Sequence, residues 1–174
     1  MTIEEIRENP RSSASHDPML TSTDLAAFIA QEGIAAEIVK LPVHTPTVET
    51  AAQALGVDSA QIVKTVVFLV DSRPYLVIAN GTTRVDTRKI ATHSGVGRKR
   101  VKLANADAVL AITGYLAGAV PPFGHKHPLP ALLDPGVLTQ PVVYAGGGDI
   151  DALLRITPDE LRRVTGAQLV LVSG

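Results

Sequence analysis

A glycine- and proline-rich stretch at residues 113–124 is the part of the sequence best suited to bind a ligand through its backbone. Its glycines permit positive φ and close approach to a ligand, whereas Pro121 and Pro122 fix φ and stiffen the chain. Such a loop can present N–H groups to an oxyanion or a carbonyl oxygen. A purely structural Ω-loop is the alternative. Because proline carries no N–H, the candidate donors are those of Gly118, Ala119, Val120, Phe123 and Gly124.

Lys64 is a second candidate, since it lies in an otherwise mainly apolar segment, 62–68. A lysine in such a strand either extends its ammonium past the sheet edge into solvent or points it into a pocket. In a pocket it would bind a phosphate or a carboxyl-type oxygen. His44 precedes an expected helix and could line the same pocket, with an exposed position equally consistent with the sequence.

Several kinds of chemistry are excluded by what the sequence lacks. It has no cysteine, which removes thiol nucleophiles, disulfides and cysteine-ligated metal centres. It has no Gly-x-Ser-x-Gly motif, so a serine nucleophile on a strand–helix elbow is not expected. His125 and His127 could share a strand face, but five histidines without cysteine make a metal site a minor alternative, and no cofactor is expected. A water molecule or a group of the substrate would therefore have to act as the nucleophile.

Charge is distributed unevenly along the chain. Sixteen Lys and Arg against seventeen Asp and Glu give a net charge of −1, which excludes binding to nucleic acid through an overall positive field. Residues 84–102, however, carry a net charge of +6 and leave −7 for the rest. Such segregation suits a phosphate backbone, although a solvated helix face is the usual explanation for a charge run. The basic residues are Arg84, Arg88, Lys89, Arg98, Lys99, Arg100 and Lys102.

Helix signals recur along the chain, each with a capping residue at its start. The last is the clearest, because Thr157 at the N-cap, Pro158 in the first turn and Glu160 three residues after the cap form a capping box. Earlier helices are expected after the hydroxyl cluster 21–23 and after Thr47, Asp86 and Asn105, ending near Gly33, Gly56, Ser94 and Ile112.

A β-hairpin is the strongest strand signal, with an aliphatic run at 63–70, turn residues at 71–74 and a second run at 75–79. Because strands and helices interleave around this antiparallel unit, the sequence predicts an α/β single domain with a mixed sheet. A loop is expected over 114–130, and shorter strands at 36–41, 132–133, 142–145, 153–156 and 168–172.

The N-terminal residues 1–20 mix charges, serines and two prolines without a sustained period, which favours a flexible tail before a domain of residues 21–174. The start of the chain lacks the apolar segment of a secretory signal. No apolar run is long enough to span a bilayer. We therefore expect a cytoplasmic location.

Several short motifs, taken in order, resemble those of the YbaK/EbsC family. The resemblance extends over about residues 26–172, and the combination of a Lys-Thr strand with a Gly-x-x-x-Pro loop is specific. Many members have Gly-Gly-x-Ser-Pro in this loop, from which the present chain departs. The matching motifs are Ile62-Val63-Lys64-Thr65-Val66-Val67, Arg84-Val85-Asp86, Thr113-Gly114-Tyr115, Gly118-Ala119-Val120-Pro121-Pro122-Phe123-Gly124 and Leu133-Asp134.

The resemblance implies a mixed, largely antiparallel sheet flanked by helices and an aminoacyl-tRNA deacylase related to the editing domain of bacterial prolyl-tRNA synthetases. Such an enzyme hydrolyses the ester of a mischarged tRNA, here proline tRNA carrying a small amino acid. The expected partners are the acceptor 3′ end of tRNA, held by the basic residues of 84–100, and prolyl-tRNA synthetase. The implied catalytic residues are Lys64 and Gly118, and the implied substrate-binding residues are Ala119, Val120, Pro122, Phe123, Gly124, His44 and Tyr115.

Two alternatives remain open at this point. The altered loop is consistent with a non-catalytic family member that binds tRNA or a synthetase. A hydrolase of small esters is also consistent with the residues, and its affinity for substrate would not fall with salt, since no phosphate contacts would be made.

Overall fold

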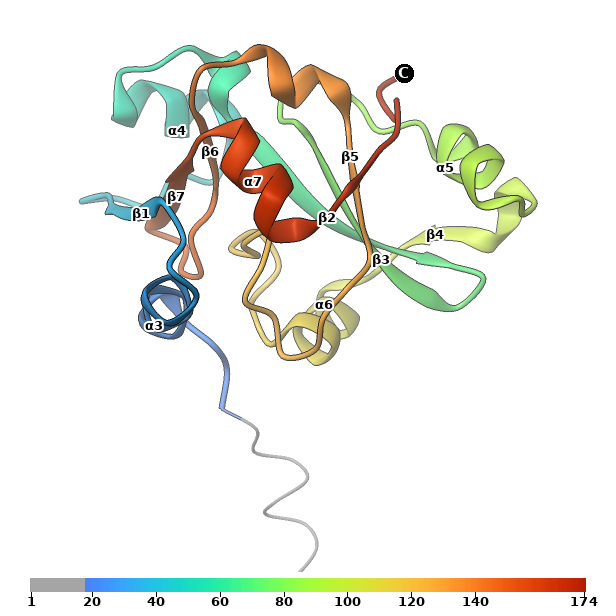
Figure 1. Ribbon diagram of the computed structural model, residues 1–174, viewed down its shortest axis with the longest axis horizontal. Coiled ribbons are helices and arrows are strands. Elements are labelled where there is room, and N and C mark those ends of the chain that lie inside the picture. Colours follow the sequence, from blue (N-terminus) through green and yellow to red (C-terminus); the bar gives the residue numbers. More distant parts are fainter. Residues whose placement is uncertain (1–17) are drawn as a thin grey trace, which may run out of the picture.

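The computed structural model describes residues 18–174, which form two β-sheets with helices around them (Figure 1). The five-stranded sheet has the order β4-β2-β3-β5-β8 and the three-stranded sheet the order β1-β7-β6. Only the β3–β5 and β5–β8 pairs are parallel. The strands are β1 (Ala36–Lys40), β2 (Val63–Val70), β3 (Arg73–Asn80), β4 (Val101–Leu103), β5 (Ala131–Leu133), β6 (Val143–Gly146), β7 (Ala152–Ile156) and β8 (Gln168–Leu169).

The predicted fold class is confirmed: a single α/β domain with a mixed, largely antiparallel arrangement of strands and flanking helices. One detail differs, because the strands divide between two sheets rather than forming one. A parallel bridge between Ile62 and Tyr144 connects them where β2 begins. This division places β6 and β7 against one face of the β2–β3 hairpin.

The β2–β3 hairpin lies where the sequence predicts it. Its strands pair along their full length and end at Val70 opposite Arg73. The two turn residues have positive φ, 49° at Asp71 and 67° at Ser72. Positive φ at both central positions is the type I′ geometry, which matches the twist of a hairpin.

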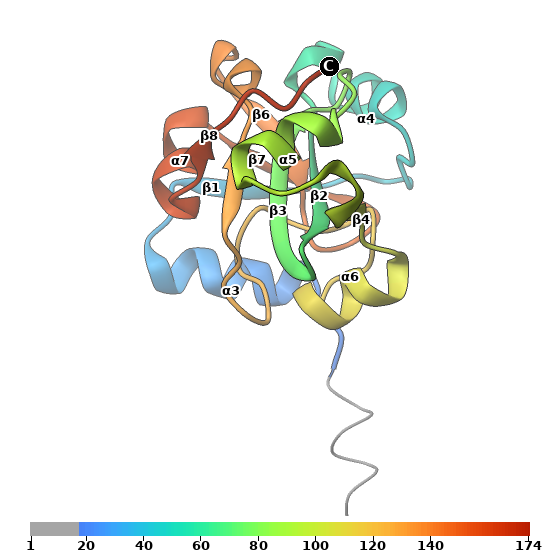
Figure 2. The same cartoon turned by 90° about the vertical axis from the view of Figure 1, so that its right-hand side faces the viewer.

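The two faces of the hairpin are buried in different hydrophobic clusters. On one face Val67 packs in the main core, which includes Leu154 of β7. On the other, Phe68 packs with Ile90 of α5 (Thr87–Ser94). Figure 2 shows α5 in front of the hairpin, with the three-stranded sheet behind it. Both faces of the hairpin therefore pack against neighbouring elements.

Helix caps agree with the sequence. Each α-helix of the described chain follows its predicted cap residue and ends before a glycine of left-handed conformation. Three short 3₁₀ helices, Ser59–Gln61, Arg98–Arg100 and Pro135–Thr139, complete this part of the chain. Besides α5, the α-helices are α3 (Ser22–Glu32), α4 (Val48–Leu55), α6 (Ala106–Thr113) and α7 (Pro158–Thr165).

The capping box predicted for α7 is only half formed. Thr157 Oγ1 accepts from the main-chain N–H of Glu160 at 3.3 Å, as expected. The Glu160 carboxylate, however, accepts from the N–H of Ala35 at 2.7 Å and from Arg163 at 2.5 Å. Because Ala35 precedes β1, the Glu160 carboxylate stabilises the contact between α7 and the smaller sheet. This hydrogen bond joins residues distant in sequence, so the capping pattern at 157–160 does not predict it.

Two edges of the larger sheet also differ from the expectation. β8 covers only 168–169 because the N–H groups of Val172 and Ser173 both donate to the buried carboxylate of Asp134, each at 2.9 Å, instead of to a strand. β4 is not anticipated because it has only three residues and follows the charged turn Arg98–Arg100.

The tail expected over 1–20 falls mainly outside the described residues. Within them, Leu20 donates a main-chain hydrogen bond to Gly114 at 2.8 Å and packs against the main core. Contacts with the domain therefore begin before Thr21. No helix in residues 18–174 is long and apolar enough to cross a membrane.

Candidate functional site

A cavity of about 390 Å³ brings Lys64 and Gly118 together at the edge of β2. Lys64 comes from the start of this strand and Gly118 from the loop after α6. The other lining residues come from 45–51, from Ile62 and β2, from 103–109, and from Ala117, Val120, Gly146 and Leu153. The wall is largely aliphatic and contains no carboxylate among residues 18–174.

The cavity opens where one edge of β2 is uncovered. β4 pairs only with residues 68–70 of β2, and Ala104 adds one bond to the carbonyl of Val67 at 3.1 Å. Main-chain groups alternate sides along a strand, so the N–H and C=O of Thr65 point to the same edge as those of Val67. Side chains of Lys64 and Thr65 lie on opposite faces. Both line the cavity because it opens at this edge.

The ammonium of Lys64 is held by the turn that follows β3. Nζ donates a hydrogen bond to the carbonyl oxygen of Thr83, and the side chain is half-buried. Burial lowers the pKa of Lys64 from its ordinary value of 10.5, because a desolvated environment disfavours the charged form. An ammonium has three donors, and the remaining two can bind an oxygen of a substrate in the cavity.

The first half of the predicted loop supplies N–H groups. Gly118 has φ +90°, a left-handed conformation that favours glycine. The N–H groups of Gly118 and Val120 have no hydrogen-bond partner within residues 18–174. Ala119 is a correction to the expected set of donors, since it is buried and its N–H donates to Leu116 at 3.0 Å. Two free donors therefore belong to residues that line the cavity.

A run of three glycines, residues 146–148, supports this loop from the β6–β7 turn. A Cβ on Gly146 would lie 2.2 Å from the carbonyl oxygen of Val120. Gly148 donates its N–H to Ala119 O at 2.9 Å. This run is not among the residues predicted from the sequence, although consecutive glycines at a strand end are a signal of close backbone approach.

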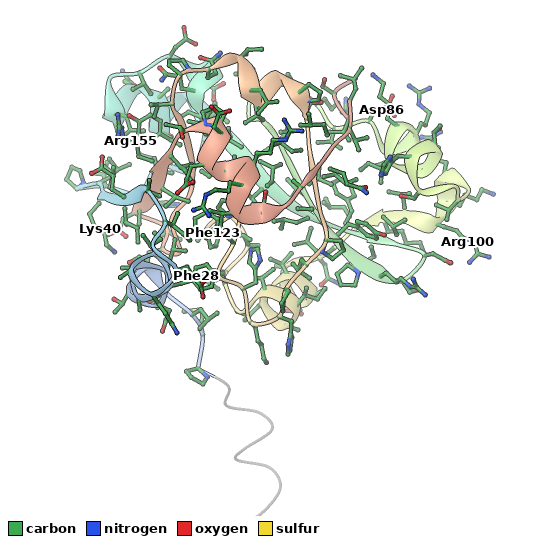
Figure 3. All side chains as sticks on the ribbon, in the orientation of Figure 1. Phe28, Lys40, Asp86, Arg100, Phe123 and Arg155 are labelled. Carbon is green, nitrogen blue, oxygen red and sulfur yellow. The ribbon has the colours of Figure 1, made fainter. Side chains whose placement is uncertain are left out.

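The second half of the loop faces a different hollow. Pro122, Phe123 and Gly124 line a cavity of about 180 Å³ together with Phe28 of α3. The rings of Phe28 and Phe123 stack with centroids 5.9 Å apart, and Figure 3 shows them side by side. The structure thus does not place these three predicted substrate-binding residues in the wall of the Lys64 cavity.

Tyr115 and His125 hold the loop rather than line the Lys64 cavity. The buried Tyr115 donates its hydroxyl to Gly124 O at 3.1 Å, and burial raises the pKa of this phenol to about 12. His125 donates Nε2–H to Pro121 O at 2.6 Å, and burial lowers the pKa of the imidazole. Both side chains therefore fix the backbone conformation of the loop.

His44 is exposed and does not belong to the wall of the Lys64 cavity. The residues that follow it, Thr45 to Val48, do line that cavity and lead into α4. The structure therefore places His44 beside the cavity, at the start of one of its walls.

The basic segment, residues 84–102, borders the cavity at both ends. Thr83, immediately before it, accepts the hydrogen bond from Lys64. Leu103, immediately after it, lines the cavity. Between them the chain forms α5 and the turn Arg98–Arg100. Figure 3 shows Asp86 and Arg100 of this region at the right-hand side of the molecule.

The cations of the basic segment differ in their partners. Arg88 pairs with Asp86 at 3.0 Å, and Arg100 pairs with Asp71 at 2.6 Å. Lys89 donates to the carbonyl of Ser173 at 2.5 Å. Four other cations have no ion pair or side-chain hydrogen bond to any residue of 18–174: Arg84, Arg98, Lys99 and Lys102. A polar hollow of about 560 Å³ is lined by Arg84, Arg88 and Arg98 among others.

Comparison with known proteins gives the family. The sequence matches the family model of the aminoacyl-tRNA editing domain over residues 43–164. The chain belongs to this family. The matched range contains Lys64, the Gly118 loop and the whole basic segment.

Two relatives of this editing domain carry informative names. EbsC of Enterococcus faecalis, named as a candidate Cys-tRNA(Pro)/Cys-tRNA(Cys) deacylase, is 25% identical over 126 residues, which are 72% of this chain and 76% of EbsC. A proline–tRNA ligase of Citrifermentans bemidjiense is 32% identical over 85 residues, 47% of this chain and 14% of the ligase. The similarity to the ligase is therefore confined to a small part of that protein.

A solved structure confirms the editing-domain fold. A protein described as a candidate trans-editing enzyme for prolyl tRNA synthetase superposes with a TM-score of 0.82 and 37% identity, over 88% of this chain and 96% of the other. The resemblance to the YbaK/EbsC family is thereby confirmed.

Proposed function

We propose that this editing domain is a trans-acting deacylase that hydrolyses the ester of a mischarged tRNA, with proline tRNA carrying a small amino acid as substrate. The observation that carries the proposal is the cavity shared by Lys64 and Gly118 beside a basic segment. The names of EbsC and of the superposable candidate trans-editing enzyme support the substrate class.

In this proposal the cavity receives the aminoacyl ester at the 3′ end of the tRNA. The Lys64 ammonium and the N–H groups of Gly118 and Val120 bind the ester carbonyl oxygen. They stabilise the negative charge that develops there when water, or a hydroxyl of the substrate, attacks the carbonyl carbon. The bond between this carbon and the ribose oxygen then breaks, and that oxygen leaves as a hydroxyl with the proton that the attacking group releases. Where a substrate hydroxyl has attacked, water then hydrolyses the new ester. Loss of one such donor costs about 3 kcal/mol of barrier.

The basic segment would hold the tRNA. Three of its four unpaired cations, Arg84, Arg98 and Lys99, are available for phosphates without breaking an ion pair of the described chain. Because Thr83, just before the segment, contacts Lys64 and Leu103, just after it, lines the cavity, a strand bound along the segment would lead its 3′ end to Lys64. Aromatic residues are few, so phosphate contacts would dominate over base stacking.

Deacylation of a panel of mischarged proline tRNAs tests the proposal. The wild-type chain should hydrolyse at least one ester faster than buffer, and Lys64→Ala should slow this by about 100-fold, the cost of one charged donor. Lys40→Ala is a matched control, since Lys40 lies outside the cavity in exposed ion pairs with Asp149 and Asp151.

Other results would contradict the proposed roles. A Lys64→Ala protein as active as wild type would remove Lys64 from the mechanism. Salt-sensitive tRNA binding without hydrolysis would instead indicate the non-catalytic member of the family. Hydrolysis of small aminoacyl esters with no dependence on tRNA or salt would indicate the small-ester hydrolase.

A further inference from the structure

Thr65 carries a polar group that neither the fold nor the proposed reaction uses. Its Oγ1 is buried and has no hydrogen-bond partner within residues 18–174, a property shared there only by Ser94. Of the two, only Thr65 lines the Lys64 cavity. A buried hydroxyl without a partner is unfavourable. Because Thr65 lies in the cavity wall, a ligand there can supply the missing hydrogen bond.

The hydroxyl lies on the aliphatic side of the cavity. Val63 and Val67, two residues before and after Thr65, pack in the main core with Val109 and Val120. Because side chains alternate along a strand, Thr65 shares this face, opposite to that of Lys64. A rotation of about 120° about χ1 moves the hydroxyl out of its buried position to one that the methyl or the hydrogen now occupies.

Two other threonines, Thr45 and Thr47, line the cavity, and the hydroxyl of Thr47 is already used. Thr47 Oγ1 accepts from the N–H of Thr50 at 3.1 Å and contacts its hydroxyl at 2.9 Å, which commits it to the helix cap. Of these three threonines, Thr65 is the one whose hydroxyl oxygen is buried and has no hydrogen-bond partner within residues 18–174.

We propose that Thr65 binds a hydroxyl on the side chain of the ester-linked amino acid, an inference that rests on the proposed function. The preferred substrates are then tRNAs that carry serine or threonine rather than alanine. The aliphatic wall has no carboxylate to pair with a cationic side chain. A site that hydrogen-bonds a substrate hydroxyl discriminates against an analogue without it, because its own polar group is then left unpaired.

The test compares hydrolysis of Ser-, Thr- and Ala-charged proline tRNA by wild type, Thr65→Val and Thr65→Ser. Wild type should prefer the seryl ester over the alanyl ester by about ten-fold or more in kcat/KM. Thr65→Val keeps the shape but removes the hydroxyl, so it should lose this preference by slowing seryl and threonyl hydrolysis while alanyl hydrolysis is kept. Thr65→Ser should retain it.

The outcomes separate this inference from the proposed function. Hydrolysis of none of the esters by wild type would overturn both. Alanyl hydrolysis as fast as seryl hydrolysis, or an equal slowing of all three esters by Thr65→Val, would overturn the side-chain assignment alone. Thermal unfolding provides a separate check, since Thr65→Val breaks no hydrogen bond of the described chain and should not lower the Tm. A lowered Tm with unchanged preference would make Thr65 structural and contradict the inference.

Discussion

The α-carbon of Gly146 lies directly against the carbonyl group of Val120, so close that an added Cβ would be 2.2 Å from the oxygen. The end of β6 therefore supports the Gly118 loop by contact between two backbones. The Gly148–Ala119 hydrogen bond, 2.9 Å long, holds the same two segments together. The position of the loop N–H groups relative to Lys64 consequently depends on the absence of a side chain at 146.

We expect Gly146→Ala to displace the loop and reduce deacylation by ten-fold or more, because the obstacle is main-chain carbonyl and cannot rotate away. Overpacking of this kind destabilises by about 1–3 kcal/mol. Gly97→Ala is the matched control, since a Cβ there meets nothing within 4 Å and φ is −70°. Urea unfolding and the initial deacylation rate measure the two effects, and equal behaviour of both variants would contradict the supporting role.

Removal of the unpaired cations should weaken tRNA binding in a salt-dependent way. For each phosphate that the protein no longer binds, the slope of log K against log [salt] becomes shallower by about 0.7 on single strands and about 0.9 on duplex. We expect Arg98→Ala and Lys99→Ala each to show this change in titrations between about 50 and 200 mM salt. Arg162→Ala, an exposed arginine of α7 outside the basic segment, should leave the slope unchanged. A slope that is the same in all three variants would place the tRNA on another surface.

Glu160 should make the stability depend on acidic pH. The hydrogen bonds from Arg163 and from the N–H of Ala35 lower the pKa of this carboxyl from 4.5 to about 2. Between these values the unfolded chain binds the proton more readily, so the contribution of Glu160 is complete above pH 4.5 and is lost as the pH falls toward 2. The urea midpoint of wild type should therefore fall more steeply over this window than that of Glu160→Gln. Parallel curves would show that the carboxylate is not bound in this way.

The desolvation of Lys64 can be measured directly. Because burial lowers the pKa of Lys64 below 10.5, its ammonium should lose its proton at lower pH than the ordinary value. Reductive methylation with ¹³C-formaldehyde and NMR titration would report this midpoint, and Lys64→Arg would identify the signal by removing it. A midpoint at or above 10.5 would contradict the half-buried position beside Thr83.

Local chemistry was predictable because it depends on neighbours in sequence. Asp86 and Asn105 cap the helices that they were expected to cap, and the hairpin turn falls on Asp71 and Ser72. The predictions that the structure corrects involve hydrogen-bond partners distant in sequence. Glu160 binds Ala35 instead of completing its own capping box, and Asp134 takes the N–H groups that would have extended β8.

Periodicity, capping and turn chemistry depend on adjacent residues, so the fold class, the helix caps and the motifs of an editing domain are readable from the sequence. Which of those residues meet depends on how the elements pack. The packing placed Lys64, Gly118 and the unpaired Thr65 hydroxyl at one open strand edge, and it placed Phe123 and Tyr115 elsewhere. The open edge exists because β4 pairs only with residues 68–70 and leaves the beginning of β2 unpaired. The sequence of β2 does not show how long its partner strand is, because that length depends on pairing between segments distant in sequence.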